Sequence, residues 1–220
     1  MTKSLTYCNG LILYKNFSLD NELYQLIVEN GATQIINRFY DRADQTNITA
    51  ITDGLATNNN EAFTYNYAGR LASATSATTL YGTRSWTYDQ NGNRATETAN
   101  GVQDSYYYVT NSNRLSNIAQ GSTAKRIFSY DAAGNVTQDY RNNTNAYNYT
   151  VNNAGRIKQL SLNTGTSLTT YLYDGFQRLR VKTQSAPVST THYIWDSFGH
   201  IIAEHNGSGG GVQKDNIWLG

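Results

Sequence analysis

The stretch Phe128-Ser129-Tyr130-Asp131-Ala132-Ala133-Gly134-Asn135-Val136 decides the fold of this 220-residue chain. It follows the order aromatic, any residue, aromatic, Asp, two residues, Gly, an amide or basic residue, aliphatic. A second clear copy runs Trp86-Thr87-Tyr88-Asp89-Gln90-Asn91-Gly92-Asn93-Arg94. Looser copies stay in phase, with the second aromatic position, called the anchor below, at Leu19, Tyr40, Tyr65, Tyr88, Val109, Tyr130, Val151, Tyr173 and Trp195. Nine copies spaced 21 to 25 residues apart indicate an array of repeated supersecondary units.

Each copy has the residue order of a β-hairpin. Residues two apart in a strand point to the same face of a sheet, so the two aromatic positions share a face. Asp accepts N–H bonds from residues just ahead of it, and Gly adopts the left-handed conformation that closes a bulged turn. We therefore predict structural turn residues at Asp89, Gly92, Asp131, Gly134, Asp174, Asp196 and Gly199.

The predicted fold class is all-β. A lone hairpin is marginally stable in water, so each unit needs neighbours to cover its aromatic face. We expect the hairpins to stack into a spiralling antiparallel sheet, a β-solenoid or shell segment, because strands twist with a fixed hand. Residues 1–220 are expected to form a single array of about nine hairpin units.

Composition excludes several classes of function. Seventeen Lys and Arg nearly balance sixteen Asp and Glu, so we expect no nucleic-acid partner. Cys8 is the single cysteine, and no Cys or His spacing resembles a zinc site. No apolar run is long enough for a signal peptide or a membrane span. We expect no cofactor and no bound metal.

The chain resembles the Rhs/YD-repeat family, which is named for its recurrent Tyr-Asp pair. The segments from Tyr130-Asp131 to Thr137 and from Tyr173-Asp174 to Leu179 carry the resemblance, which extends from about Leu5 to Gly220. The family includes bacterial polymorphic toxins, the C components of insecticidal toxin complexes, and teneurins. Residues 193–220 look like the start of the family's core segment, cut short at Gly220.

The resemblance implies a shell that encloses a C-terminal toxin. Its expected partners are further YD repeats, the core segment and the toxin cargo of a larger chain or complex. Neither the family's aspartate-dependent self-cleavage site nor a toxin domain maps onto these residues. The expected function is therefore a non-enzymatic structural shell segment. As part of a larger bacterial toxin it would be secreted or at the cell surface, and it would be cytoplasmic if expressed alone.

Four copies depart from the family pattern. Leu19-Asp20 and Tyr40-Asp41 are followed by extra residues, whereas Val109-Thr110 and Val151-Asn152 lack the Tyr-Asp pair. We expect bulged hairpins or a change of sheet curvature at these copies.

Side chains with catalytic potential are better explained by the repeat. His192, His200 and His205 lie near Asp196 and Glu204, which suggests a metal or acid–base site. Asp196 and His200, however, occupy regular turn positions. Turn aspartates of stacked hairpins should lie about 10 Å apart, too far for an acid–nucleophile pair. We therefore predict no catalytic residues.

Two sets of side chains could bind glycans. Arginines recur after the turn glycine position at 70, 114, 156 and 178, either as a basic ladder for an anionic polysaccharide or paired with turn aspartates of adjacent units. Near-zero net charge favours pairing. Tyr106, Tyr108 and Tyr147 fall out of phase and are predicted to be exposed aromatic residues that contact carbohydrate.

Three roles remain open from the sequence. The first is the shell segment, and the second is a module that binds carbohydrate or a cell-surface partner through the exposed sheet face. The third is a truncated remnant with no independent role. Unpaired terminal strands also predict self-association through sheet edges.

Overall fold

The computed structural model describes residues 1–43, 46–77, 80–141, 145–207 and 209–218. The chain forms two compact units, Met1–Tyr106 and Tyr107–Gly220. The first unit contains β1 (Thr2–Thr6), β2 (Leu11–Phe17), β3 (Leu23–Asn30), β4 (Thr33–Ala43), β5 (Asn47–Asp53), β6 (Glu61–Tyr65), β7 (Leu71–Ser76), β8 (Thr83–Tyr88), β9 (Arg94–Ala99), most of β10 (Val102–Tyr108), and a 3₁₀ turn at Thr57–Asn59.

The second unit continues with β-strands alone among its described residues. These are β11 (Leu115–Gln120), β12 (Thr123–Tyr130), β13 (Val136–Arg141), β14 (Asn145–Val151), β15 (Ile157–Leu162), β16 (Ser167–Tyr173), β17 (Leu179–Ser185), β18 (Val188–Trp195), β19 (Ile201–Asn206) and β20 (Val212–Asp215). The prediction of an all-β hairpin array is confirmed.

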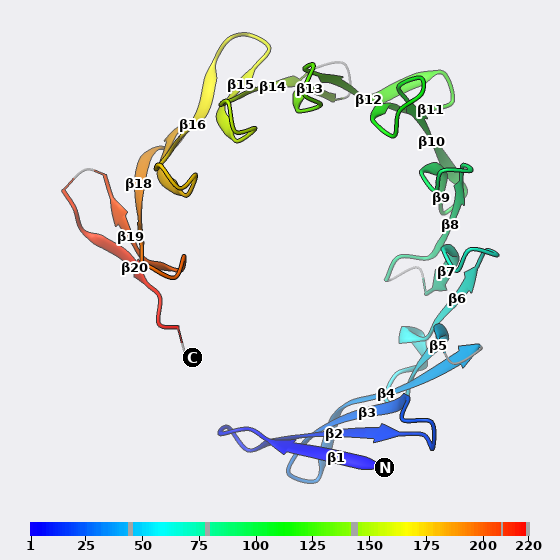
Figure 1. Ribbon diagram of the computed structural model, residues 1–220. Coiled ribbons are helices and arrows are strands. Elements are labelled where there is room, and N and C mark those ends of the chain that lie inside the picture. Colours follow the sequence, from blue (N-terminus) through cyan, green and yellow to red (C-terminus); the bar gives the residue numbers. More distant parts are fainter. Residues whose placement is uncertain (44–45, 78–79, 142–144, 208, 219–220) are drawn as a thin grey trace. The chain divides into compact units, whose positions relative to one another are not determined.

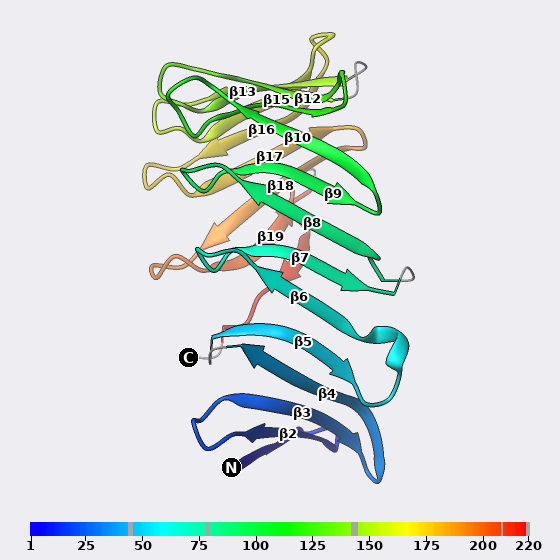
Figure 2. The same cartoon turned by 90° about the vertical axis from the view of Figure 1, so that its right-hand side faces the viewer.

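Strands pair in sequence order within each unit (Figure 1). Each strand from β1 to β9 pairs antiparallel with the next strand along the chain, and so does each strand from β11 to β19. Figure 2 shows β2 to β9 of the first unit side by side, with alternating direction. The connectors between predicted hairpins are therefore hairpin turns themselves.

Turns of more than one kind join the described strands. One kind follows the anchor residue and is preceded by a shift of strand register, as between Ser129 and Tyr130. Such bulges raise the local twist of the pair. A tighter kind is seen where Asn100 and Gly101, both at positive φ, join β9 to β10. Two positive-φ residues in a two-residue loop match the twist of the flanking strands.

Three predicted anchors are out of phase with the structure. In the first predicted copy the turn runs from Ser18, whose N–H donates to the Glu22 carbonyl, so Phe17 is the anchor and Leu19 is a fully exposed turn residue. The predicted turn at Tyr40-Asp41 is wrong, because both residues lie inside β4. A register shift does occur between Asp41 and Arg42, as expected for a bulged hairpin.

The third phase error concerns Val109. Its N–H donates to the Arg114 carbonyl at 2.8 Å, so Val109 is the first turn residue and Tyr108 ends the strand. The physical reason is shared by all three copies. In none of them is the fourth residue after the predicted anchor a Gly. The sequence there does not fix where the left-handed residue falls.

The core of each unit is thin. Among the described residues, the fully buried side chains are four alanines, Ala74, Ala119, Ala146 and Ala203, and two polar residues, Asp139 and Thr169. Most large apolar side chains are half-buried. Small side chains fit where neighbouring strands approach, and the aromatic residues provide most of the remaining cover.

Candidate functional site

Most turns that follow an anchor share one hydrogen-bond pattern. In the Asp131 turn, the Asp131 N–H donates to the Asn135 carbonyl at 3.0 Å, and the Gly134 N–H donates to the Asp131 carbonyl at 3.0 Å. The Asp131 carboxylate accepts the Asn135 N–H at 2.8 Å. Gly134 has a φ of 90°, a conformation that side-chain-bearing residues avoid. The same main-chain pattern opens at Asn66, Asp89, Asn152, Asp174 and Asp196.

These hydrogen bonds hold the turn aspartates in the ionised form. The side-chain amide of Asn135 is the main cause of the lowered pKa of Asp131, and Asn93 acts in the same way on Asp89. The His200 backbone N–H is the main cause of the lowered pKa of Asp196. A carboxylate held ionised as an acceptor is poorly suited to donate a proton near neutral pH.

Six aromatic side chains form a ladder in which each is hydrogen-bonded to the repeat before it. The Tyr130 hydroxyl donates to the Leu115 carbonyl at 2.8 Å, and the Trp195 indole N–H donates to the Leu179 carbonyl at 2.7 Å. The other members are Tyr65 to Ile48, Tyr88 to Leu71, Tyr173 to Ile157 and Trp218 to Ile201. In every case but Tyr65, whose acceptor lies in β5, the carbonyl belongs to the first strand residue after the preceding turn. These anchors therefore link neighbouring repeats by a hydrogen bond and also cover the sheet with their rings.

A cation lies over several anchor rings. Arg70 lies 5.6 Å from the Tyr88 ring centre, Arg114 lies 5.8 Å from that of Tyr130, and Arg178 lies 5.8 Å from that of Trp195. These are cation–π distances. In the described part of the chain, these arginines do not form the predicted ion pairs with aspartates of adjacent repeats. Arg178 instead pairs with Asp174 of its own turn at 2.8 Å.

The three histidines lie in two different settings. His200 Nδ1 lies 2.9 Å from Asp196 Oδ2 within one turn, and the His200 ring stacks on Trp218 with centres 4.7 Å apart. His192 and His205 are cross-strand partners in β18 and β19. Within the described ranges, no group of three His, Cys, Asp or Glu side chains could hold a metal ion.

Asp139 forms a buried ion cluster that sequence reasoning missed. Its side chain is 2% exposed and accepts two bonds of 2.7 Å from Arg126, with Arg141 at 2.7 and 2.9 Å. The Arg126 hydrogen bonds are the main cause of the lowered pKa of Asp139. In the first unit, Glu97 likewise accepts from Arg84, Arg94 and Tyr106. The cross-strand register could have indicated both clusters, since it places these acids and arginines on one face of adjacent strands.

The tyrosines predicted to contact carbohydrate are half-buried. The Tyr106 hydroxyl donates to Glu97 at 2.9 Å, and the Arg94 guanidinium lies over the Tyr106 ring at 5.5 Å. Arg141 covers the Tyr147 ring at 5.1 Å. Tyr108 is also half-buried, whereas Tyr107 is 50% exposed. The exposed tyrosine of β10 is therefore Tyr107, because the phase of the Val109 copy is shifted by one residue.

The hairpins, the repeated turns and the aromatic ladder define a β-hairpin repeat protein. A family model described as the teneurin YD-shell matches residues 17–208. The chain belongs to that family. No curated protein matches it.

Solved structures give more distant similarities. A Photorhabdus luminescens Tc holotoxin pore is 12% identical over 93% of this chain and 14% of that chain, with a TM-score of 0.41. A TcdB2-TccC3-Cdc42 structure is 14% identical over 92% of this chain and 14% of that chain, with a TM-score of 0.39. This chain thus corresponds to a small part of the length of either. In the described part of the chain, no helix has the length and apolar character to cross a membrane.

Proposed function

We propose that this chain is a non-enzymatic shell segment of an Rhs-type toxin, whose hairpins help to enclose a polypeptide cargo. The observation that carries the proposal is membership of the YD-shell family over residues 17–208. The repeated side chains support it, because the turn aspartates accept hydrogen bonds within their own turns and the anchor side chains donate hydrogen bonds to the neighbouring repeat. Residues 1–220 are then one array whose partners are further YD repeats, a core segment and a toxin cargo.

Residues 193–220 fit the start of a core segment in this proposal. Trp218 continues the aromatic ladder to Ile201, so the repeat pattern extends past β20. Leu219 and Gly220, the last residues of this segment, lie outside the described residues. As part of a toxin, the chain would act after secretion or at the cell surface.

Limited proteolysis of the polypeptide encoded by the whole reading frame tests the shell. We expect a segment outside the repeats to survive protease doses that digest the same segment expressed alone, with mass spectrometry identifying the survivor. A combined Tyr130→Phe and Tyr173→Phe variant should lose this protection, because two joints of the ladder are broken. Equal digestion of the free segment and the segment in the full polypeptide would contradict enclosure.

Binding of carbohydrate or a cell-surface partner is the second candidate. Three aromatic rings at turn tips favour it: Tyr67, Phe176 and Phe198 are all more than four-fifths exposed. Aromatic faces of this kind stack on sugar rings. A glycan array with Tyr106→Ala, Tyr108→Ala and Tyr147→Ala variants tests the original assignment. A Phe176→Ala and Phe198→Ala variant tests the turn tips.

A remnant with no independent role would show neither protection nor binding.

Self-association through sheet edges is a separate proposal. β1 and β20 each pair with one neighbour, and every residue of both strands is exposed. Such edges present free main-chain N–H and C=O groups to another chain. Light scattering should give a mass that rises with concentration. A constant monomer mass would contradict edge pairing.

A further inference from the structure

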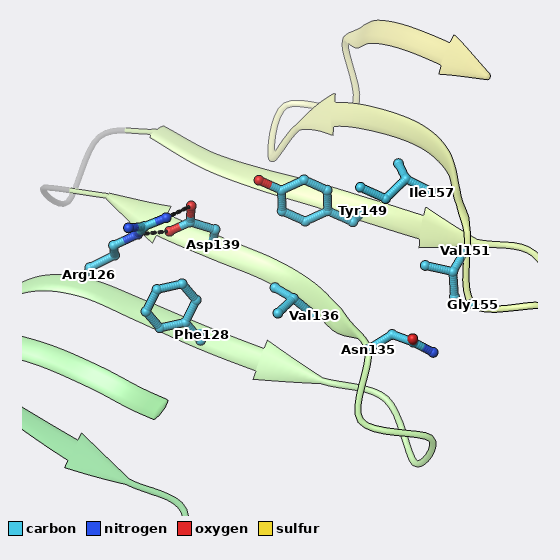
Figure 3. A pocket seen from close by; sticks show the side chains of 9 residues that line it. All are labelled: Arg126, Phe128, Asn135, Val136, Asp139, Tyr149, Val151, Gly155 and Ile157. Atoms are coloured by element: carbon cyan, nitrogen blue, oxygen red, sulfur yellow. Dashed lines mark hydrogen bonds and ion pairs between the residues drawn. The ribbon is translucent and has the colours of Figure 1, made fainter. Parts of the chain in front are cut away.

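A pocket of about 340 Å³ lies on the second unit between β12, β13, β14 and β15. Figure 3 shows its apolar walls, formed by Phe128, Val136, Val151 and Ile157, with Tyr149 beside them. The Arg126–Asp139 ion pair lies at one end. Its volume is at the small end of the range for ligand sites, which suits a single ring better than an extended ligand.

The pocket lies where the aromatic ladder is interrupted. Val151 is an anchor, because the register shifts directly before it and the Asn152 turn follows. Its neighbours in the ladder, Tyr130 and Tyr173, donate to the Leu115 and Ile157 carbonyls. The equivalent acceptor for position 151 is the Val136 carbonyl, the first residue of β13. A valine has neither a ring to fill the space nor a donor for that carbonyl.

The arginine that covers three other anchor rings is replaced by an amide at this position. Arg114 and Arg178 precede Tyr130 and Trp195 and lie over their rings. The equivalent residue before Val151 is Asn135, whose amide donates to Asp131 in its own turn at 2.9 Å. Asn135 therefore lines the pocket without covering it.

The charged end of the pocket does not call for a charged ligand. Asp139 is 2% exposed, and its two oxygens already accept four bonds from Arg126 and Arg141. An added cation would compete with these bonds, and an added anion would have to draw guanidinium groups away from the buried carboxylate. A neutral ring with one hydrogen-bond donor matches the apolar walls and the main-chain acceptor.

We propose that this pocket binds a phenolic ring, which takes the place that anchor tyrosines occupy in neighbouring repeats and donates its hydroxyl to the Val136 carbonyl. The ring packs against Val151 and Ile157. Two sources share this chemistry, a free phenol and the tyrosine side chain of another polypeptide segment. The inference goes beyond the shell proposal and depends only on the geometry of one repeat.

NMR titration of the 220-residue chain with 4-methylphenol tests the site. We expect saturable shifts centred on the amides of Val136 and Val151, and binding about fivefold tighter than that of toluene, which lacks the donor. N-acetyl-tyrosinamide distinguishes the sources: binding of both probes extends the site to tyrosine side chains, and binding of 4-methylphenol alone restricts it to free phenols. The absence of saturable binding by both up to about 10 mM would overturn the proposal.

Val151→Tyr is the decisive variant. It restores the ladder residue and should weaken 4-methylphenol binding by at least about tenfold, because the new ring occupies the pocket. Val151→Phe should also block the site and serves if the tyrosine variant fails to fold. Val188→Tyr, a change at a largely exposed residue of β18, is the matched control and should leave the affinity unchanged. Undiminished binding by a folded Val151→Tyr or Val151→Phe variant would overturn the proposal.

Discussion

The Tyr130 hydroxyl donates a hydrogen bond of 2.8 Å to the main-chain carbonyl of Leu115, 15 residues earlier in the chain. The bond runs from the anchor of one repeat to the first strand residue of the preceding one. The bond therefore links the β12–β13 hairpin to a strand outside that hairpin. Phenylalanine at this position would cover the sheet equally well, but it could not form this hydrogen bond.

Tyr130→Phe should lower the free energy of unfolding by about 1 kcal/mol, because the half-buried carbonyl loses its side-chain donor. Urea unfolding followed by circular dichroism measures the change. Tyr140→Phe is the matched control, since its hydroxyl has no hydrogen-bond partner within the described residues. Equal stability of Tyr130→Phe and the unmodified chain would show that the ladder bond contributes little.

Asp139→Asn should destabilise the second unit by about 2 kcal/mol at neutral pH, because bonds to two arginines lose their charge assistance. The pKa of Asp139 is lowered in the folded chain by its Arg126 hydrogen bonds. Its contribution is therefore complete above the ordinary carboxyl value of 3.8 and is lost as pH falls through the lower folded value.

The pH profile tests this sign. We expect the stability difference between Asp139→Asn and the unmodified chain to shrink as pH falls below about 4, as measured by thermal melting across a pH series. Asp20→Asn makes the same charge change at an exposed turn residue and should have little effect. A difference that grows in acid would contradict the assignment.

Gln177→Gly should stabilise the Asp174 turn by about 1 kcal/mol. Gln177 has a φ of 61° at the position where other turns have glycine, and a side chain is disfavoured there. The loss of its 3.2 Å contact with Asn152 offsets part of the gain. The reverse change, Gly134→Ala at a φ of 90°, should lower the melting temperature. The two variants should shift the melt in opposite directions.

Arg178→Ala should loosen the link between the Asp174 and Asp196 turns. Arg178 pairs with Asp174, donates to the Asp196 carbonyl at 3.2 Å and lies over the Trp195 ring. We expect faster hydrogen exchange at the Asp196 and Gly199 amides. Arg180→Ala, a nearby exposed arginine, provides the control. Unchanged exchange in Arg178→Ala would mean that the turns hold their form independently.

The sequence predicts the fold well where both Asp or Asn and Gly mark the turn. The copies at Tyr88, Tyr130 and Val151 have the predicted phase because the following Gly92, Gly134 and Gly155 locate the left-handed residue. The copy at Leu19 is out of phase because Asn21 takes the left-handed position in a turn that begins at Ser18.

The contacts between repeats were not predictable in the same way. A tyrosine on a half-buried face is explained by burial alone, so its hydroxyl partner one repeat away leaves no local sequence signal. The Arg126–Asp139 pair depends on cross-strand register, which a single bulge changes by one residue. The pocket at Val151 was visible in the sequence only as a lost Tyr-Asp pair.

The ladder bond has a consequence for how this kind of chain can change in evolution. The six aromatic residues of the ladder each donate to a main-chain carbonyl, which every residue type possesses, and the acceptors are Leu or Ile at different positions. A joint of this kind does not require two matched side chains. Whole repeats can therefore be duplicated or deleted in frame without a compensating substitution, and the length of the array is free to vary by steps of one repeat.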